Sequence, residues 1–472
     1  MPALRSGRRR KEVAAMNRVM RRAKILLILI LVLLGGTLFF LGEYVMKSSQ
    51  WVHAPGSPHL YNAGNIGCGT ITDRDKNLLL DLTGGRTYAA NELLRSSTMH
   101  WLGDRQGNIS APALAHYAQQ IAGFDPLNGV YAYGGTGGQV KLTLSAKLQM
   151  AALDAMGSHR GTLAIYNYQT GEILCAVTTP TYDPENVPDI SADQTDAYQG
   201  VYLNRFTQAA YTPGSIYKIV TAAAALEAVP GIEDQEFVCE GKLEYGIDVV
   251  TCMEEHGVQT FKDAFKNSCN CAFAKISEQI GGKRLAWYAH QFGLLDALQF
   301  DGITTAKGLI DCEDRADVLV AWSAIGQHKD LVNPASFLAF VGAVSNNGVL
   351  KTPYLVDSIQ VGIKTTYRVA DDQNPDKRIM STATAQKLQE MMRNNVENYY
   401  GDENFAGFTV CAKSGTAEVG GDKKPNAMFT GFVLDEEYPL AFIVAIEEGG
   451  YGRPTCVPIL EKVLQVCKEA LS

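Results

Sequence analysis

An uncharged run of about 18 residues, Ile25 to Gly42, restricts the fold of this chain more than any other feature. Its length is near the lower limit for crossing a bilayer. Nine basic residues precede it, namely Arg5, Arg8, Arg9, Arg10, Lys11, Arg18, Arg21, Arg22 and Lys24. Because a basic flank stays in the cytoplasm, we expect a cytoplasmic tail over 1–24, a single transmembrane anchor over 25–44, and an extracellular or periplasmic body after it. The large residues Leu38–Leu41 favour an uncleaved anchor over a signal peptide.

The exported part of the chain is acidic. The first 24 residues carry a net charge of +8 and the whole 472-residue chain carries −8, so the remainder is near −16 with His neutral. An acidic body argues against a nucleic-acid partner, because a phosphate backbone attracts basic surfaces.

Cysteine spacing indicates one candidate disulfide and no metal site. Cys239 and Cys252 flank a segment with hairpin-like alternation and could form a disulfide outside the cell, or they could remain buried thiols. Cys269 and Cys271 are only two residues apart and lack a second pair, so no Cys/His set shows zinc spacing. We therefore expect no metal ion and no cofactor.

Apolar patterns predict an α+β fold for the larger part of the chain. A hairpin pattern near residue 170 and three strand patterns near the end of the chain give five strands, at Thr162–Tyr166, Ile173–Val177, Phe408–Lys413, Met428–Val433 and Leu440–Ala445. Helical patterns fall before, between and after them, at about Ala146–Met156, Phe261–Gln279, Lys283–Gln291, Ala316–Gly326, Pro334–Asn346, Ala383–Glu397 and Val457–Leu471. These patterns predict an antiparallel five-stranded sheet flanked by helices.

The segment between the anchor and this domain is rich in turn residues. It ends in the glycine run Gly134–Gly138, which lacks the Lys-Ser/Thr of a phosphate-binding loop and is more typical of a linker. The sequence thus predicts a short membrane-proximal domain over 45–138 and a second domain over 139–472.

The stretch Tyr211–Lys218 carries the clearest chemical signal. Pro213-Gly214 is a turn, and Ser215 follows it at the start of an apolar, alanine-rich helix. Lys218 lies three residues later on the same helix face, within reach of the Ser215 hydroxyl. A lysine can remove the proton of a serine only if burial keeps the amine neutral. Taken alone, Ser-x-x-Lys is common, and a capping serine with a surface lysine is the simpler interpretation.

Two later stretches favour the chemical interpretation. Ser268 and Asn270 lie two residues apart, so a loop or helix start would let one face the nucleophile and the other a substrate amide. A second set of residues lies at the end of a predicted strand. It offers a cation, two hydroxyls and a glycine that lets a substrate backbone lie close alongside. Its members are Lys413, Ser414, Gly415 and Thr416. A ligand carboxylate is the natural partner of this set.

Ser-x-x-Lys, Ser-x-Asn and Lys-Ser-Gly, in this order on helix, loop and strand, resemble the penicillin-binding proteins, the serine acyl transferases that cross-link peptidoglycan. Other stretches resemble the same family, namely Gly171–Leu174, Pro180–Pro184, Asn204-Arg205, His256-Gly257, Ile325–Gln327 and Asn426–Phe432. Thr72–Asp75 resembles the membrane-proximal segment of the class B group. The likeness covers nearly all of the chain after the anchor, and it implies the fold shared by serine transpeptidases and β-lactamases.

Carried onto this sequence, the resemblance implies that Ser215 attacks a D-alanyl-D-alanine stem peptide and forms an acyl-enzyme after Lys218 takes its proton. Ser268 would pass that proton toward the leaving amine, and Asn270 would orient the acyl amide. The terminal carboxylate would be held by Lys413, Ser414 and Thr416. The backbone N–H groups of Ser215 and Thr416 would stabilise the oxyanion. β-Lactam antibiotics would acylate the same serine, and a membrane glycan polymerase is the expected partner.

The sequence departs from the family pattern at two positions and leaves other functions open. Ser414 stands where threonine is frequent, and His328 stands where a glycine is usual. The same residues would also serve a D,D-carboxypeptidase, a β-lactamase or β-lactam sensor, or an inactive scaffold of a wall-building complex. The short segment before the second domain excludes the bifunctional class A group by length. The class B flanks favour cross-linking.

Overall fold

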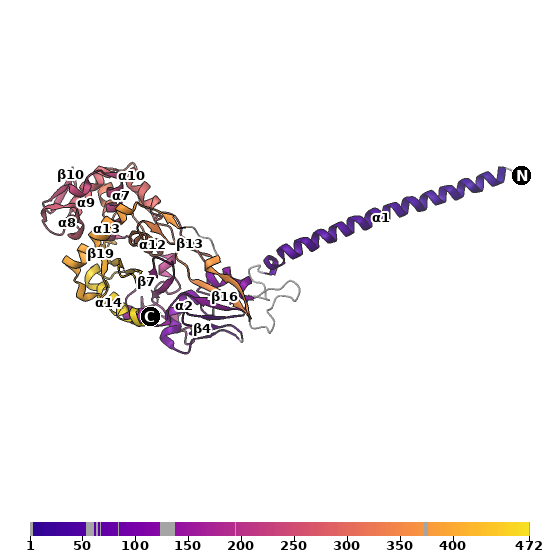
Figure 1. Cartoon of the computed structure of the whole chain (residues 1–472), viewed down its shortest axis with the longest axis horizontal. Helices are drawn as coiled ribbons and strands as arrows, with labels where there is room; N and C mark the ends of the chain where they lie inside the picture. Colours follow the sequence, from indigo (N-terminus) through magenta and orange to yellow (C-terminus); the bar gives the residue numbers. More distant parts are fainter. Residues whose placement is uncertain are drawn as a thin grey trace.

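The computed structural model describes residues 3–52, 61–62, 65–66, 68–83, 85–122, 137–193, 195–371 and 376–471. Helix α1 (Ala3–Val52) projects from the body as one long rod (Figure 1). Its segment Val13–Lys47 is long and apolar enough to cross a membrane, and none of its most apolar stretch is buried against the protein. This helix contains the expected anchor, 25–44, and its exposure agrees with an anchor rather than a core helix.

A five-stranded sheet forms the centre of the body. Its strand order is β19-β20-β21-β7-β8, and every neighbouring pair is antiparallel. The strands are β7 (Gly161–Asn167), β8 (Ile173–Thr179), β19 (Val410–Ala417), β20 (Asn426–Val433) and β21 (Leu440–Ile446). The predicted sheet is therefore confirmed in type and strand number, and the predicted strand positions agree to within a few residues.

Helices cover both faces of this sheet. Leu163 and Ile165 of β7 point toward α5 (Ala146–Met156) and α14 (Gly452–Leu471), whereas Ala164 points to the opposite core, as the two-residue period of a strand requires.

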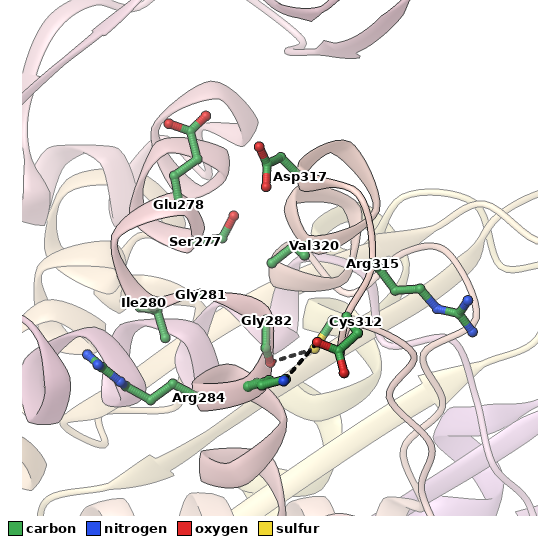
Figure 2. A pocket seen from close by; sticks show the side chains of 12 residues that line it. Ser277, Glu278, Ile280, Gly281, Gly282, Arg284, Cys312, Arg315, Asp317 and Val320 are labelled. Carbon is green, nitrogen blue, oxygen red and sulfur yellow. Dashed lines mark hydrogen bonds and ion pairs between the residues drawn. The ribbon is translucent and has the colours of Figure 1, made fainter.

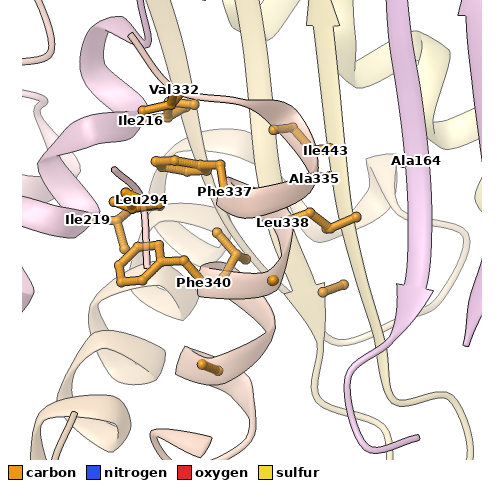
Figure 3. Packing of buried hydrophobic residues seen from close by; sticks show 14 of the residues in the cluster. Ala164, Ile216, Ile219, Leu294, Val332, Ala335, Phe337, Leu338, Phe340 and Ile443 are labelled. Atoms are coloured by element: carbon orange, nitrogen blue, oxygen red, sulfur yellow. The ribbon is translucent and has the colours of Figure 1, made fainter. Parts of the chain in front are cut away.

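On that opposite face, α12 (Pro334–Ser345) lies against the sheet. Figure 3 shows Phe337 and Phe340 of this helix beside Ile216 and Ile219, with Leu338 directed toward the sheet. These apolar contacts hold the segment after Ser215 against α12.

A helical region lies at the end of the body far from α1 (Figure 1). It contains α7 (Lys218–Ala228), α8 (Phe261–Lys266), α9 (Asn270–Ile280), α10 (Gly282–Gln291), α11 (Asp317–Ala324) and α13 (Thr382–Asn395). The single helix expected over 261–279 is wrong in one respect, because the structure breaks it at 267–269. Ser268 has a φ of +53°, which no helical residue adopts, so the motif occupies a tight turn between two helices.

A second sheet lies between α1 and the central sheet. Its strand order is β17-β16-β6-β3-β4-β5. The strands are β3 (Thr70–Thr72), β4 (Leu78–Asp81), β5 (Thr87–Tyr88), β6 (Gln139–Leu142), β16 (Val356–Val361) and β17 (Lys364–Arg368). This sheet takes strands from both sides of residue 138, so the two expected domains share it. Most of the glycine run expected to be a linker, 134–136, lies outside the described residues.

The remaining described elements are short, apart from α2. The helices are α2 (Glu92–Leu102), α3 (Pro112–His116), α4 (Ala118–Ala122) and α6 (Arg205–Gln208). The strands are β1 (Tyr61–Asn62), β2 (Asn65–Ile66), β9 (Glu236–Cys239), β10 (Lys242–Tyr245), β11 (Asp248–Thr251), β12 (Gly257–Thr260), β13 (Gln299–Phe300), β14 (Ile303–Thr304), β15 (Val349–Leu350) and β18 (Lys377–Arg378).

A partly buried ion pair joins α2 to the loop after β8. The guanidinium of Arg95 donates from Nε and Nη2 to the two oxygens of Asp183, each at 2.5 Å, and the side chains are only 11% and 8% exposed. These hydrogen bonds from Arg95 hold the pKa of Asp183 well below its usual range. The pair thus stabilises the fold only while Asp183 is ionised.

We expect Asp183→Asn to lower the free energy of unfolding at pH 7 by about 2 kcal/mol, because it weakens two charge-assisted hydrogen bonds of a partly buried pair. A carboxyl with a depressed folded pKa gives its stabilisation above the unfolded pKa, so the difference from wild type should shrink as pH falls below about 4. Chemical denaturation of the detergent-solubilised chain measures this.

Glu469→Gln is the matched control for Asp183→Asn. It removes the exposed pair with Lys147, whose side chains are 49% (Lys147) and 78% (Glu469) exposed. Such a surface pair contributes about 0–1 kcal/mol. Equal losses in the two variants would contradict the importance of the Arg95–Asp183 pair.

Candidate active site

Ser215 lies in a 3₁₀ turn, Gly214–Tyr217, which leads directly into α7. Ser215 is half-buried, whereas Lys218 at the start of α7 is fully buried. The Lys218 ammonium donates to Ser215 Oγ at 3.1 Å. The structure therefore places the hydroxyl and the amine in direct contact, with only the hydroxyl facing outward.

Lys218 also contacts the second motif. Its Nζ lies 2.6 Å from the carbonyl oxygen of Ser268, 3.2 Å from Ser268 Oγ and 2.7 Å from Asn270 Oδ1. Burial lowers the pKa of Lys218 to about 8, since water no longer solvates the charged form. A substantial share of the amine is therefore neutral near physiological pH, as a general base requires.

Lys413 on β19 reaches the same hydroxyl from the other side. Its Nζ donates to Ser268 Oγ at 3.0 Å and to the Ser414 carbonyl at 3.2 Å. Burial, and then the charge of Lys218, lower the pKa of Lys413 well below its usual value. Ser268 thus bridges two buried amines, which can exchange a proton through its hydroxyl without a large movement.

The end of β19 lies directly against the turn that carries Ser215. A Cβ added to Gly415 would lie 2.8 Å from the carbonyl oxygen of Pro213, and one added to Gly214 would lie 2.4 Å from that of Thr416. Only glycine permits this close approach. It brings the backbone of Thr416 beside the turn that contains the Ser215 backbone.

Tyr400 is a site residue that the sequence motifs did not indicate. It ends a π-helical turn after α13 and is buried, with its hydroxyl donating to Ser414 Oγ at 2.9 Å and accepting from Ser414 N at 2.8 Å. These bonds fix the rotamer of Ser414. No spacing rule links residues 400 and 414, so only the fold could reveal the contact.

Glu447 is a second residue that the sequence did not indicate. Its carboxylate accepts from Arg205 Nε at 2.7 Å and from the Tyr211 hydroxyl at 3.0 Å. It therefore ties α6 and the segment that leads to Ser215 to the end of β21. This network therefore positions the segment before Ser215 rather than the Ser215 side chain itself.

The candidate disulfide is not formed in the structure, where Cys239 and Cys252 are both free thiols. The expected hairpin between them is present, as β10 and β11 pair antiparallel. Asn270 Nδ2 donates to the carbonyl oxygen of Thr251 at 2.8 Å. The hairpin therefore supports the amide of the second motif.

A pocket of about 450 Å³ lies apart from this cluster (Figure 2). It is lined by the end of α9, the start of α10 and the segment before α11, with Glu278, Arg284 and Asp317 giving mixed charge. None of the motif residues lines it, and along α9 the nearest lining residue, Ser277, is about 10 Å from Asn270. The cluster around Ser215, not this pocket, is the candidate active site.

The family model described as "Penicillin binding protein transpeptidase domain" matches residues 161–465. That range covers about two thirds of the chain and includes all three motifs. The chain belongs to this family. The resemblance drawn from the motifs is therefore confirmed. The expected α+β transpeptidase fold is confirmed too, and so is the expectation that the chain is a serine transpeptidase.

Two curated relatives of this penicillin-binding protein show how similar the chain is to known proteins. The "Peptidoglycan D,D-transpeptidase PbpA" of Mycolicibacterium smegmatis is 29% identical over 344 residues, which cover 66% of this chain and 68% of that protein. The "Stage V sporulation protein D" of Bacillus subtilis is 28% identical over 354 residues, covering 69% of this chain and 53% of that protein.

Solved structures agree with the fold of this penicillin-binding protein. The D,D-transpeptidase domain of a peptidoglycan glycosyltransferase from Eggerthella lenta has a TM-score of 0.72 at 25% identity, covering 85% of this chain and 98% of that one. Penicillin-binding protein A from M. tuberculosis, as a ceftriaxone acyl-enzyme complex, has a TM-score of 0.71 at 23% identity, with coverage of 85% and 98%.

The backbone at His328 agrees with the expectation that a glycine is usual at this place in the family pattern. His328 has a φ of +65°, in the left-handed region that glycine adopts without cost. Its Nε2 lies 3.5 Å from Asp311 Oδ2. Before it, Gln327 Nε2 donates to the Thr416 carbonyl at 3.5 Å. With histidine at position 328, the chain therefore still forms the turn that positions Gln327 beside β19.

Proposed function

We propose that this penicillin-binding protein is a D,D-transpeptidase that cross-links peptidoglycan stem peptides through an acyl-enzyme on Ser215. The observation that carries the proposal is the contact of Ser215 Oγ with the buried Lys218 amine at 3.1 Å. Neutral Lys218 takes the Ser215 proton as Oγ bonds to the carbonyl carbon of D-alanyl-D-alanine. The C–N bond then breaks, and terminal D-alanine leaves with that proton.

In this proposal Ser268 passes the proton from Lys218 toward the leaving amine, which its contacts with both lysines support. Asn270 orients the acyl amide of the substrate. The oxyanion accepts hydrogen bonds from the backbone N–H groups of Ser215 and Thr416, a contribution of about 3–4 kcal/mol per donor in serine hydrolases. The substrate carboxylate is bound by the end of β19, through Lys413, Ser414, Gly415 and Thr416.

β-Lactams fit the same proposal because their strained amide reacts with an activated serine and their carboxylate matches Lys413. Penicillin-binding protein A of M. tuberculosis has been solved as acyl-enzyme complexes with ceftriaxone, imipenem and penicillin G. The proton balance is the same as with the peptide, except that the leaving nitrogen stays attached through the opened ring.

The test is covalent labelling of the full chain with a fluorescent penicillin. We expect one stable adduct per chain, mapped by mass spectrometry to the peptide containing Ser215, and no adduct in Ser215→Ala. An unlabelled wild type would favour an inactive scaffold, and rapid loss of the label would favour a β-lactamase. Stem peptides that end in D-alanyl-D-alanine are then incubated with and without an acceptor amine. A cross-linked product indicates transpeptidation, and a hydrolysed product indicates a carboxypeptidase.

For the anchor we propose that the N-terminus is cytoplasmic and that the catalytic body lies outside the membrane, facing the wall. The basic residues before Ile25 and the exposed apolar surface of α1 support this orientation. That surface could bind a transmembrane helix of a glycan polymerase partner. Labelling of single cysteines placed before and after the helix in intact cells tests the orientation, and crosslinking from α1 tests the partner.

A further inference from the structure

Four side chains that can bind metal converge beside the Ser268–Asn270 turn. They are Cys239 at the end of β9, Cys252 just after β11, His256 in the next loop, and Cys269 inside the turn. The sulfurs and the closest imidazole nitrogen all lie within 4.8 Å of one another.

Two distances within the cluster match those of a tetrahedral zinc site. Zinc binds Cys sulfur at about 2.3 Å and His nitrogen at about 2.0–2.1 Å. A tetrahedron with those arms places two sulfurs about 3.8 Å apart, and a sulfur and a nitrogen about 3.6 Å apart. In the structure Cys252 Sγ lies 3.9 Å from Cys269 Sγ and 3.6 Å from His256 Nδ1.

We propose that Cys239, Cys252, His256 and Cys269 bind one zinc ion. Three thiolates and one imidazole are a ligand set of closed, structural zinc sites. Cys239 and Cys269 are buried, while Cys252 and His256 are partly exposed, which leaves a path for the ion to enter. Each thiol loses its proton when the metal binds, so affinity falls as pH falls.

This proposal departs from the expectation that the chain has no metal site. The spacing rule failed because the ligands come from separate elements, β9, the end of β11 and the turn before α9, rather than from two local pairs. The antiparallel pairing of β9 with β12, which starts at Gly257, brings His256 back beside Cys239. Such a set is visible only after folding.

The metal would hold the catalytic turn in place. Cys269 lies between Ser268 and Asn270, and the Asn270 N–H donates to Cys252 Sγ at 3.4 Å. A bond from zinc to both cysteines therefore fixes the β10–β11 hairpin to the start of α9. Because Ser268 has a positive φ, the turn needs such support to keep its two side chains directed at Lys218.

Metal analysis of the purified full chain tests the site directly. We expect about one zinc per wild-type chain, and loss of most of it in Cys252→Ala and in His256→Ala. Cys456→Ala on α14 removes a buried thiol outside the cluster and should keep the zinc. Cobalt added to the zinc-stripped chain should give the intense visible bands of a tetrahedral thiolate site, which the control should also show.

Two results would overturn the proposal. In the first, the wild-type chain is purified in the presence of zinc but binds no metal, and mass spectrometry finds disulfides among these cysteines. The other is full zinc content in both Cys252→Ala and His256→Ala. Circular dichroism separates loss of metal from loss of folding, and chelation of the folded wild type gives a metal-free sample without any substitution.

The positioning role rests on the proposed function and has its own readout. Zinc removal should slow penicillin acylation about tenfold or more, and added zinc should restore the rate. If acylation is unchanged while the metal analysis is positive, the site exists but does not position the turn. If the metal-loaded wild type is never labelled, the proposed function fails and the zinc result still stands.

Discussion

Lys218→Ala is expected to slow acylation of Ser215 by penicillin about 1,000-fold or more at pH 7.5, because a positioned general base contributes roughly 10²- to 10⁴-fold. The variant keeps the nucleophile and removes the only amine that the structure places in contact with its hydroxyl among the described residues. Stopped-flow measurement of the second-order rate constant with a fluorescent penicillin checks this.

Lys218→Arg separates basicity from charge in the same experiment. An arginine stays protonated at any accessible pH and cannot take the Ser215 proton, so we expect a loss as large as that of alanine. Lys275→Ala on the exposed face of α9 should leave the rate unchanged. Recovery of most of the activity by arginine would show that Lys218 acts as a cation and not as a base.

The pH profile of wild-type acylation follows from the burial of Lys218. Burial lowers its pKa to about 8, so the neutral, active form increases as pH rises through that value. The rate should therefore rise toward a plateau above pH 8. A rate that falls over this range would require a protonated Lys218.

Most of the central fold was predictable because its elements are local patterns. Alternation and apolar runs located the five strands, and their antiparallel sheet was confirmed. The turn before Ser215 was recognisable from Pro213-Gly214 because proline and glycine dictate backbone geometry locally.

The shared second sheet could not be predicted, because its pairing joins distant segments. Strand β3 pairs with β6 in parallel across about 70 residues, and β16 comes from far later in the chain. Asp73 illustrates this, since its carboxylate accepts from Ala146 N at 3.0 Å at the start of α5. In the sequence it belonged only to a family-like tetrapeptide.

The sequence indicated the motif residues of the candidate site, but it did not indicate the residues that hold them in place. The three motifs supplied the expected cluster, and the structure brings Ser215, Lys218, Ser268, Asn270 and Lys413 together. The residues around them, Tyr400, Glu447 and the four zinc candidates, follow no fixed spacing. They act through contacts between elements, which only the folded chain creates.

Lys413→Met should slow penicillin acylation by about 10- to 100-fold, since a hydrogen bond to a charged group contributes about 1.5–3 kcal/mol. Lys413 is 1% exposed, and neither it nor Lys218 has a carboxylate partner in the described structure, so under the proposed function the ligand carboxylate would supply the missing negative charge. The midpoint of the acylation profile should stay near pH 8, because burial and not Lys413 lowers the pKa of Lys218.

A penicillin methyl ester provides the matched control for Lys413→Met, because it keeps the reactive ring and lacks the carboxylate. If Lys413 binds that carboxylate, the ester should react slowly with the wild type, and Lys413→Met should slow it little further. The two changes are then strongly non-additive, which marks a direct interaction in a double-mutant cycle. Additive losses would instead assign Lys413 to supporting Ser268, whose Oγ it contacts at 3.0 Å. The cycle thus distinguishes substrate binding from proton relay for the same buried amine.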